Sequence, residues 1–242
     1  MPHITGTLIN VATVLVGGAL GLLFGARLPE RLKQTVITAL GLFTAVIGIR
    51  MFLETENPLV VLGSLLLGAL LGEWWRIEDG LQALGGRLEG RFSPKSGSGQ
   101  ERTEGSRFVR GFLTASLLFC IGPMTILGSI QDGLSGNFET LAIKSVLDGF
   151  AALAFASSLG VGVLFSVLII LVYQGGISLL AAQLNAVVTP AMMAEMTAAG
   201  GVILVGIALS SLLEIRKIRV GNFLPALALA PLLVALLAWL QI

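Results

Sequence analysis

The sequence is poor in charge: Asp, Glu, Lys and Arg together make up only 12% of its 242 residues. An ordinary soluble domain carries about 25% charged residues, so this chain could not cover a folded core with polar surface. Its net charge is only +1, which gives no basic footprint for a nucleic acid. The shortage of charge therefore excludes an ordinary soluble domain, and we expect no nucleic-acid partner.

Cysteine and histidine are each present once, as Cys120 and His3. A single cysteine cannot form an internal disulfide or a thiolate metal cage, and a single histidine cannot build a histidine metal site within one chain. We therefore expect no enzyme, no catalytic residues and no cofactor other than a coupling cation. An intramembrane enzyme is the least favoured interpretation, because its only candidates would be Ser129 or Thr125 near Asp132.

Apolar residues, by contrast, are abundant: they make up 55% of the chain, and its mean hydropathy is +0.93. Several apolar runs are longer than the ~20 residues that cross a bilayer as a helix. These runs are continuous and do not alternate with a period of two, which favours helices over a barrel. The sequence predicts an all-α polytopic membrane protein that resides in a lipid bilayer.

The hydropathy pattern predicts about eight transmembrane helices, or seven if the fourth or sixth is re-entrant. The predicted spans cover roughly residues 4–24, 36–53, 59–75, 108–130, 141–159, 161–184, 197–213 and 223–240. Between the third and fourth spans, apolar residues recur every three or four positions from Ile77 to Phe92, which indicates an amphipathic surface helix. We divide the chain into residues 1–76 (helices 1–3), 77–107 (surface helix and flexible polar linker) and 108–242 (helices 4–8).

Basic residues predict the orientation. The connections after predicted helices 1, 3, 5 and 7, with the residues adjoining them, hold 13 of the 15 Lys and Arg residues. Only Arg50 and Lys144 lie elsewhere. Because cytoplasmic loops collect Lys and Arg, these connections are predicted to face the cytoplasm and both termini the outside.

A weak internal repeat relates the two ends of the chain. Gly17-Gly18 and Gly175-Gly176 are 158 residues apart, and a Thr-Ala-x-Gly motif recurs at Thr38 and Thr197, 159 residues apart. Helices 1–3 would then match helices 6–8 as inverted copies, a common arrangement in secondary transporters. The alternatives are a parallel pairing of helices 1–4 with helices 5–8, and a chance coincidence of glycine pairs.

Two of the predicted helices contain sequences that interrupt a helix. Proline at Gly122-Pro123 removes a backbone N–H and clashes one turn back, so helix 4 is predicted to break and free carbonyl groups. In lipid those carbonyls need partners or a water-lined cavity. The break is therefore either an ion or solute site at open helix ends or a structural kink. Gln174-Gly175 marks a similar interruption in helix 6, or a place of close helix packing.

A lysine and an aspartate open predicted helix 5. Lys144 and Asp148 lie four residues apart and therefore share a helix face. Asp148 is predicted about one turn inside the bilayer, where an unpaired charge costs at least ~2.5–3.5 kcal/mol, so it must face the protein interior and find a partner. Asp148 is accordingly a candidate cation or proton site with Lys144 as its counter-ion, or one half of a static ion pair.

Other polar residues complete the candidate binding set. Ser129, Gln131 and Asp132 lie in or beside the turn between helices 4 and 5, and predict either a vestibule or an Asp-Gly turn in water. Asn10 could ligate an ion through its carbonyl oxygen or bond to a neighbouring helix. Glycines spaced four apart, as in Gly17, Gly21 and Gly25, favour close helix packing within the chain or in a homo-oligomer.

Three segments carry a resemblance to a known family. They are Gly6 to Asn10, Gly122 to Leu134 and Lys144 to Gly149. The chain resembles the YdfK/YqgA-like family of uncharacterised bacterial inner-membrane proteins over its whole length. The resemblance implies a multi-pass protein of the bacterial cytoplasmic membrane, and it brings no established substrate or site residues.

These observations favour a transporter or channel for an ion or small solute. Broken helices 4 and 6 would meet helix 5 near the bilayer midplane, with Asp148 binding the cation. The alternative is a non-transporting membrane scaffold or accessory subunit, which would use the surface helix and the basic inner loops to bind lipid or a partner.

Overall fold

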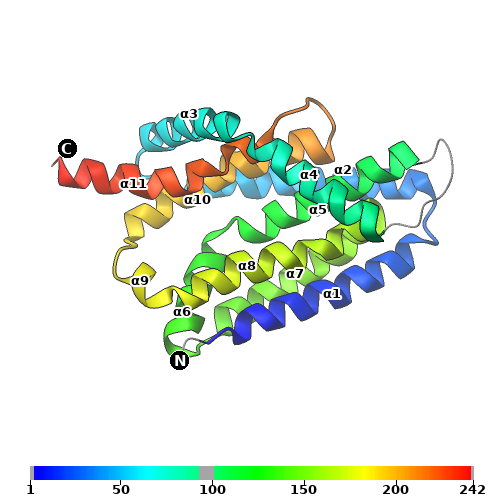
Figure 1. The fold of residues 1–242 in the computed structure, drawn as a ribbon, viewed down its shortest axis with the longest axis horizontal. Helices are drawn as coiled ribbons and strands as arrows, with labels where there is room; N and C mark the ends of the chain where they lie inside the picture. The colour runs from blue at the N-terminus through cyan, green and yellow to red at the C-terminus, as the bar shows by residue number, and fades with distance from the viewer. Residues whose placement is uncertain (1–2, 93–100, 241–242) are drawn as a thin grey trace. The chain divides into compact units, whose positions relative to one another are not determined.

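The computed structural model describes residues 3–92 and 101–240, and over these residues it contains helices and no strands (Figure 1). This confirms the all-α prediction. The helices, in chain order, are α1 (Thr5–Gly25), α2 (Glu30–Phe52), α3 (Pro58–Trp75), α4 (Ile77–Phe92), α5 (Glu101–Cys120), α6 (Pro123–Ser135), α7 (Glu139–Leu159), η1 (Val161–Phe165), α8 (Ser166–Leu179), α9 (Ala181–Asn185), α10 (Pro190–Ile207), η2 (Ala208–Leu212), η3 (Val220–Phe223) and α11 (Pro225–Trp239).

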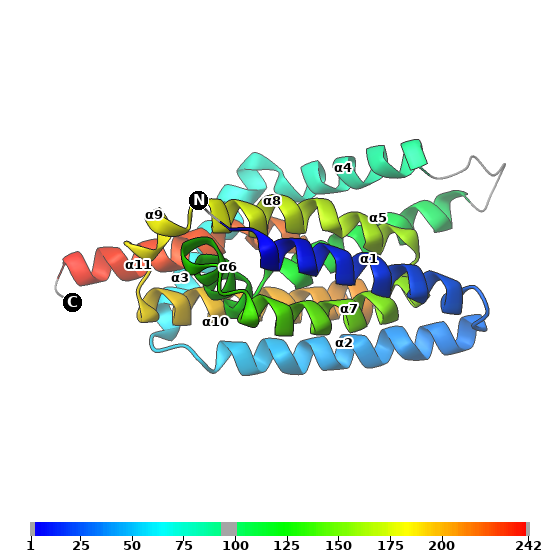
Figure 2. The ribbon, with the colours of Figure 1, turned by 90° about the horizontal axis from the view of Figure 1, so that it is seen from below.

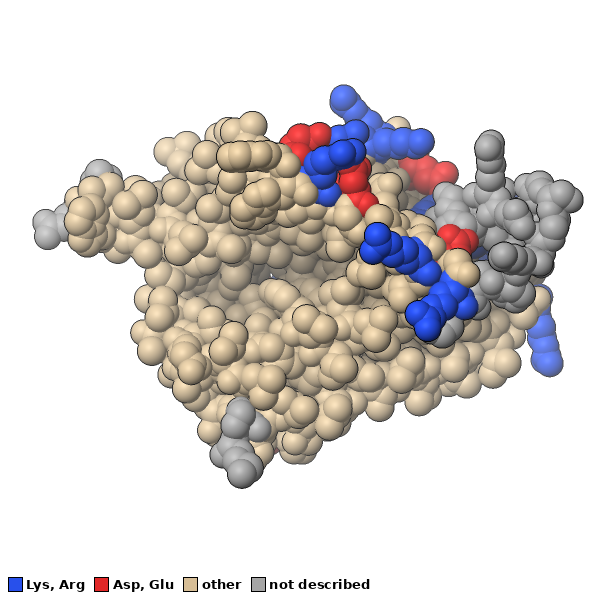
Figure 3. All heavy atoms as spheres, viewed as in Figure 1, with Lys and Arg blue, Asp and Glu red and all other residues tan. Residues whose placement is uncertain are grey.

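Within the described residues, seven helical segments are long and apolar enough to cross a membrane, and there are eight if the bent pair of α5 and α6 forms one span. The exposed side chains on these segments are largely apolar; Leu23 and Phe150, for example, are 68% and 70% exposed. Figure 3 shows the same property along α1 and α8, whose surfaces in that view carry no Lys, Arg, Asp or Glu. The chain is therefore a polytopic helical membrane protein.

The chain forms two compact units. Unit 1 comprises Met1–Leu40, Gln82–Cys120 and Met124–Asn185. Unit 2 comprises Gly41–Leu81, Ile121–Pro123 and Ala186–Ile242.

Helices α1 and α7 form the closest helix pair of unit 1 and lie side by side in both ribbon views (Figures 1 and 2). Their contacts keep the same order along both helices. A Cβ atom added to Gly17, Gly21 or Gly25 would lie 2.0–2.5 Å from the carbonyl oxygens of Gly149, Leu153 and Ser157. The two helices therefore run parallel, and the four-residue glycine spacing serves close packing within the chain, as one of its two interpretations predicted.

Helix α8 runs in the opposite direction to α1, because Gly18 meets Leu164 whereas Thr7 lies against Gly175. The start of α5 lies at the same end of unit 1 as η1, since a Cβ on Gly162 would lie 2.0 Å from the carbonyl oxygen of Phe108. The C-termini of α1 and α7 therefore lie at the same end of unit 1 as η1 and the start of α8.

The predicted break at Gly122-Pro123 is present. Helix α5 ends at Cys120, α6 begins at Pro123, and the two axes are bent by 62°. Gly122 has φ +150°, a backbone conformation that favours glycine. The far end of α6 packs beside the start of α1 and the end of α8, because Gly133 abuts Ser178. Since α5 starts at the opposite end, the pair crosses unit 1 completely and does not turn back as a re-entrant loop.

The sixth predicted span is interrupted at different residues from those expected. Helix α8 continues without a break through Gln174 and Gly175, so unwinding at this point is wrong. The departures from α-helix lie instead at the 3₁₀ turn Val161–Phe165 and at Leu180. A glycine pair destabilises an isolated helix, but neighbouring helices hold this one: Gly175 rests against the Thr7 methyl group at 3.7 Å.

Helix α4 occupies the segment for which the sequence predicted a surface helix. The linker following it was predicted to extend to residue 107, but α5 already begins at Glu101. Residues 93–100 of that linker lie outside the described residues.

Unit 2 is built on two antiparallel pairs, α3 with α11 and α2 with α10. Glycines again permit the close approach: Gly72 lies against the Asn222 carbonyl and Gly48 against the Gly201 carbonyl. Its core includes Val61, Ala198 and Ala230. Glu195, at 2% exposure, accepts hydrogen bonds from Thr55 Oγ1 and from the N–H groups of Glu56 and Asn57 at 2.6–2.8 Å, which fixes the turn into α3.

Candidate ion-binding site

Unit 1 brings together four of the residues that the sequence singled out. Asn10 comes from α1, Lys144 and Asp148 from α7, and Gln174 from α8. All four are buried, with Asn10 at 0% and Gln174 at 1% exposure. Residues more than a hundred positions apart in the sequence thus form one polar cluster, which we call the Asp148 cluster, inside apolar helices.

Asp148 Oδ2 is the centre of the cluster. It accepts a hydrogen bond from Asn10 Nδ2 at 3.0 Å and forms an ion pair with Lys144 Nζ. Asn10 Nδ2 also donates to Gln174 Oε1 at 2.9 Å, and Gln174 Nε2 donates to Thr7 Oγ1 at 3.3 Å. The cluster is therefore a continuous chain of hydrogen bonds that joins α7, α1 and α8.

The close packing of α1 on α7 makes these contacts possible. Gly17 and Gly149 have no side chains to hold the two backbones apart, so short polar side chains one or two turns away can meet. Thr7 was missed by sequence reasoning. Its position three residues before Asn10, on the same helix face, is the signal that could have identified it.

The charges of the Asp148 cluster balance, because one carboxylate meets one ammonium group. The pair is not fully sealed: the side chains of Lys144 and Asp148 keep 8% and 13% of their surface exposed. Both hydrogen bonds described for the Asp148 carboxylate fall on Oδ2, and Asn10 Oδ1 is buried without a partner among the described residues. An acceptor left unpaired costs free energy, and it is a ready ligand for a proton donor or a cation.

The broken end of α5 lies near this cluster. Helix α5, which ends at Cys120, packs against α7, the helix that carries Lys144 and Asp148. Across the break, Thr125 Oγ1 donates to the Phe119 carbonyl at 3.2 Å. Ser129 Oγ donates to the Thr125 carbonyl at 2.5 Å within α6. Side chains thus pair some of the backbone carbonyl groups that the break leaves without a helical N–H partner, as expected for a kink in lipid.

Asp132 lies somewhere quite different from the turn that the sequence predicted. Helix α6 continues to Ser135, so Asp132 is helical and 0% exposed, and an Asp-Gly turn in water is wrong. Its Oδ2 accepts a hydrogen bond from the Gly6 N–H at 2.8 Å. The turn signal failed because Gly133 is required for packing: a Cβ there would lie 2.0 Å from the Ser178 carbonyl oxygen.

The other predicted residues do not join the Asp148 cluster through any described hydrogen bond. Gln131 is exposed and its Oε1 accepts from Thr140 Oγ1 at 2.9 Å. Gly122 and Pro123 form the break itself, and Gly175 provides packing space beside Thr7.

Unpaired polar atoms are confined to unit 1 in the part of the chain that the structure describes. The buried side-chain atoms without a hydrogen-bond partner include atoms of Asn10, Thr114, Ser116, Asp132 and Ser178. Within the same residues no group of three or more His, Cys, Asp or Glu side chains could hold a metal ion.

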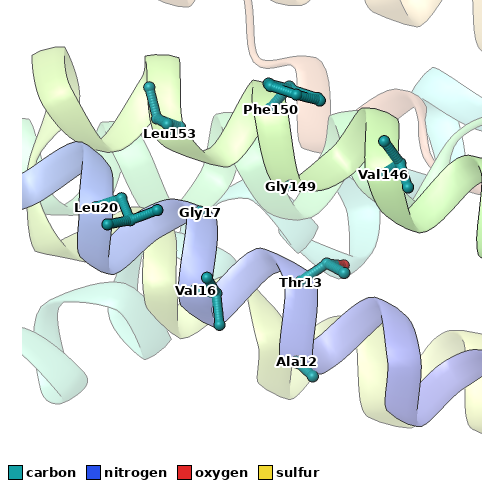
Figure 4. A pocket seen from close by; sticks show the side chains of 9 residues that line it. All are labelled: Ala12, Thr13, Val16, Gly17, Leu20, Val146, Gly149, Phe150 and Leu153. Carbon is teal, nitrogen blue, oxygen red and sulfur yellow. The ribbon is translucent and has the colours of Figure 1, made fainter.

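An apolar groove of about 360 Å³ follows the outer side of the α1 and α7 pair. Its lining includes Val16 and Leu20 on α1 and Phe150 and Leu153 on α7, which Figure 4 labels on the two neighbouring helices. Its lining contains no charged residue, so in a bilayer it would meet hydrocarbon and not an ion.

Comparisons with known proteins agree with the resemblance seen in the sequence. The family model described as Protein of unknown function (DUF554) matches residues 5–235. The chain is 35% identical over 238 residues to Uncharacterized protein YqgA of Escherichia coli (strain K12), covering 98% of this chain and 99% of that protein. It is 28% identical over 233 residues to Uncharacterized membrane protein YdfK of Bacillus subtilis (strain 168), covering 95% of each. No solved structure matches the chain.

Proposed function

The chain belongs to the DUF554 family of proteins of unknown function, and from the geometry of unit 1 we propose that it is a transporter or channel for an ion or small solute. The observation that carries the proposal is the Asp148 carboxylate, which lies in a membrane-spanning helix and is bonded to Lys144 and Asn10 beside a broken helix. Ionisable residues within membranes are rare, costly and usually functional.

In this proposal Asp148 exchanges partners. Lys144 neutralises the carboxylate when no cation is bound, and an incoming proton or small cation takes its place. Asn10 Oδ1, which is buried without a partner among the described residues, would become a ligand at that moment. Gln174 and Thr7 would hold the amide of Asn10 in position.

The proposed setting is the bacterial cytoplasmic membrane, with both termini outside and the basic connections inside. The protein would act as a homo-oligomer without catalytic groups or a cofactor. The inverted repeat of helices 1–3 and 6–8 would supply the two states of alternating access.

Flux measurements on the full chain in liposomes test the proposal. A panel of monovalent cations, protons and small solutes is screened with the wild type, and the active probe is then measured with Asp148→Asn. We expect the variant to lose about tenfold or more of the flux, because a neutral amide cannot bind a cation as a carboxylate does. Asp79→Asn, at a partly exposed position of α4 paired with Arg76, is the matched control and should transport normally. Unchanged flux in Asp148→Asn would refute the proposal.

A non-transporting scaffold is the second candidate. It is favoured by the direct pairing of Lys144 with Asp148 and by their low exposure, since a static pair could simply fix the packing of α7. Its prediction differs: removing both charges together should leave every activity of the protein intact.

A further inference from the structure

A second buried carboxylate, Asp132, lies in the same unit without a positive partner. It is 0% exposed and forms no ion pair with any described residue. Its Oδ2 accepts from the Gly6 N–H at 2.8 Å, while its Oδ1 has no hydrogen-bond partner in the described part of the chain. Burying a carboxylate without a positive partner costs free energy unless the carboxylate binds a proton or a cation.

A second unpaired oxygen belongs to the same corner of unit 1. Ser178 is 0% exposed, and its Oγ has no partner among the described residues. Its carbonyl oxygen abuts Gly133, the residue after Asp132. Figure 2 shows α6 beside the start of α1 and close to the end of α8, the elements that contribute these groups.

Capping of α1 does not by itself explain a carboxylate at this position. The first turn of a helix needs hydrogen-bond acceptors for its free N–H groups, and α1 has no side-chain cap of its own. A neutral serine or asparagine could also accept this bond, and the positive end of the α1 dipole favours a carboxylate over either. The buried Oδ1 without a partner among the described residues is what a cap does not require.

A buried polar path leads from the Asp148 cluster towards Asp132 and ends at Thr7, the residue after Gly6. Asp132 meets α1 at Gly6 and Asp148 meets it at Asn10, four residues on and so about 6 Å along the helix axis. Gln174 accepts a hydrogen bond from Asn10 and donates one to Thr7, which follows Gly6 in α1. Thr7 and Gln174 are 0% and 1% exposed, so the path is enclosed by protein.

We propose that Asp132 is a second cation site, which takes a proton or a monovalent cation and passes it to Asp148 from the end of unit 1 at which α1 begins. Asp132 Oδ1 and Ser178 Oγ supply the free oxygen ligands, and the Gly6 N–H holds the carboxylate in place. The inference rests on the proposed function, and it adds the path by which the cation enters and the class of that cation.

Chemical labelling tests this site without relying on flux. The full chain in liposomes is treated with dicyclohexylcarbodiimide, which modifies protonated carboxyl groups in apolar surroundings, and the modified residue is identified by mass spectrometry. We expect Asp132 to be modified at mildly acidic pH and to be protected by about tenfold or more when a bound ion competes. If NaCl protects Asp132 and choline chloride does not, the bound ion is a sodium-like cation. If only alkaline pH protects Asp132, the bound ion is a proton. Absence of modification at every pH would overturn the proposal.

The variant Asp132→Asn separates the cation site from the cap, because the asparagine Oδ1 can still accept from the Gly6 N–H. It should keep the thermal stability of the wild type yet slow cation uptake by about tenfold or more. Glu139→Gln, an exposed carboxylate at the start of α7, is the control and should transport normally. Normal uptake in Asp132→Asn together with loss in Asp148→Asn would remove the second site and leave the proposed function standing.

Discussion

At the scale of single residues, Asp148 and Lys144 are the most informative pair. Lys144 Nζ and the Asn10 amide both bond to the same oxygen of Asp148, Oδ2. The charge of Asp148 is therefore balanced by Lys144 and stabilised by Asn10. Removing one member of a buried pair leaves an uncompensated charge, which is far more destabilising than removing both.

Lys144→Met should therefore destabilise the protein by about 3–5 kcal/mol, because Asp148 then lacks its counter-ion in an apolar interior. Lys144→Met/Asp148→Leu should recover most of the loss. The measurement is thermal unfolding of the purified protein in detergent, followed by the fluorescence of its three tryptophans. Equal losses in the single and the double variant would contradict this account of the pair.

Glu195 shows a different use of a buried acid. Its three hydrogen bonds go to the turn between α2 and α3 in unit 2, and nothing about it suggests exchange. Glu195→Ala should cost about 3 kcal/mol or more, because it leaves two backbone N–H groups and the Thr55 hydroxyl with no acceptor. Glu195→Gln should cost less, since the amide oxygen still accepts, and thermal unfolding would show the order. A Gln variant as unstable as the Ala variant would contradict this role.

Sequence reasoning identified which residues carry chemistry better than it identified their surroundings. The four-residue spacing of Lys144 and Asp148 predicted their pairing, because local helix geometry determines it. The partnership of Asn10 with Gln174 spans 164 positions and depends on how α1 packs against α8. One of the two interpretations of Asp132 placed it in water because Asp-Gly is a turn signal, while the need for a glycine against Ser178 is a tertiary contact that no local pattern reveals.

At the scale of elements, the pairing of α1 with α7 holds the site together. Gly17 faces the Gly149 carbonyl so closely that a Cβ would lie 2.0 Å from the oxygen. Hydrophobic attraction between helices is weak in lipid, so such close backbone contact supplies much of the packing energy.

Gly17→Ala should thus force α1 and α7 apart and destabilise the protein by about 1–3 kcal/mol. Gly176→Ala in α8 is the matched control, because a Cβ at that position meets nothing within 4 Å. The control should be neutral or stabilising by up to about 1 kcal/mol, since alanine favours helix. Thermal unfolding of both variants in detergent decides the matter; equal stabilities would contradict the packing role of Gly17.

The elements themselves were largely predictable, whereas their interruptions were less so. Long apolar runs mark membrane helices whatever their partners. Pro123 broke its helix because a missing N–H is a local property. Gln174-Gly175 did not break α8, because packing beside Thr7 supports the helix there.

At the scale of the whole molecule, the directions of the helices in unit 1 make a topological prediction. Because α1 and α7 run parallel, the end of α1 and the start of α7 lie at opposite ends of unit 1. In a membrane the connection after α1 and the connection before α7 should therefore face opposite sides, with the basic one inside.

Single cysteines introduced as Arg31→Cys and Glu139→Cys in a Cys120→Ala background test this topology. A thiol reagent that cannot cross membranes should label position 139 in intact cells and position 31 only after permeabilisation. Labelling of both positions from one side would contradict the prediction that the end of α1 and the start of α7 face opposite sides. Labelling of position 31 in intact cells and of position 139 only after permeabilisation would contradict the orientation, but it would still place the two positions on opposite sides.

The most direct test of the transport account exchanges the two charges of the cluster. In Lys144→Asp/Asp148→Lys the ion pair and the net charge are kept, but the carboxylate moves one helical turn away from Asn10. Thermal stability and cation flux in liposomes are measured together on the same preparation. The account predicts a folded protein of near wild-type stability whose flux falls by about tenfold or more. A folded variant that transports as well as the wild type would show that the pair only holds helices together, and would contradict the account.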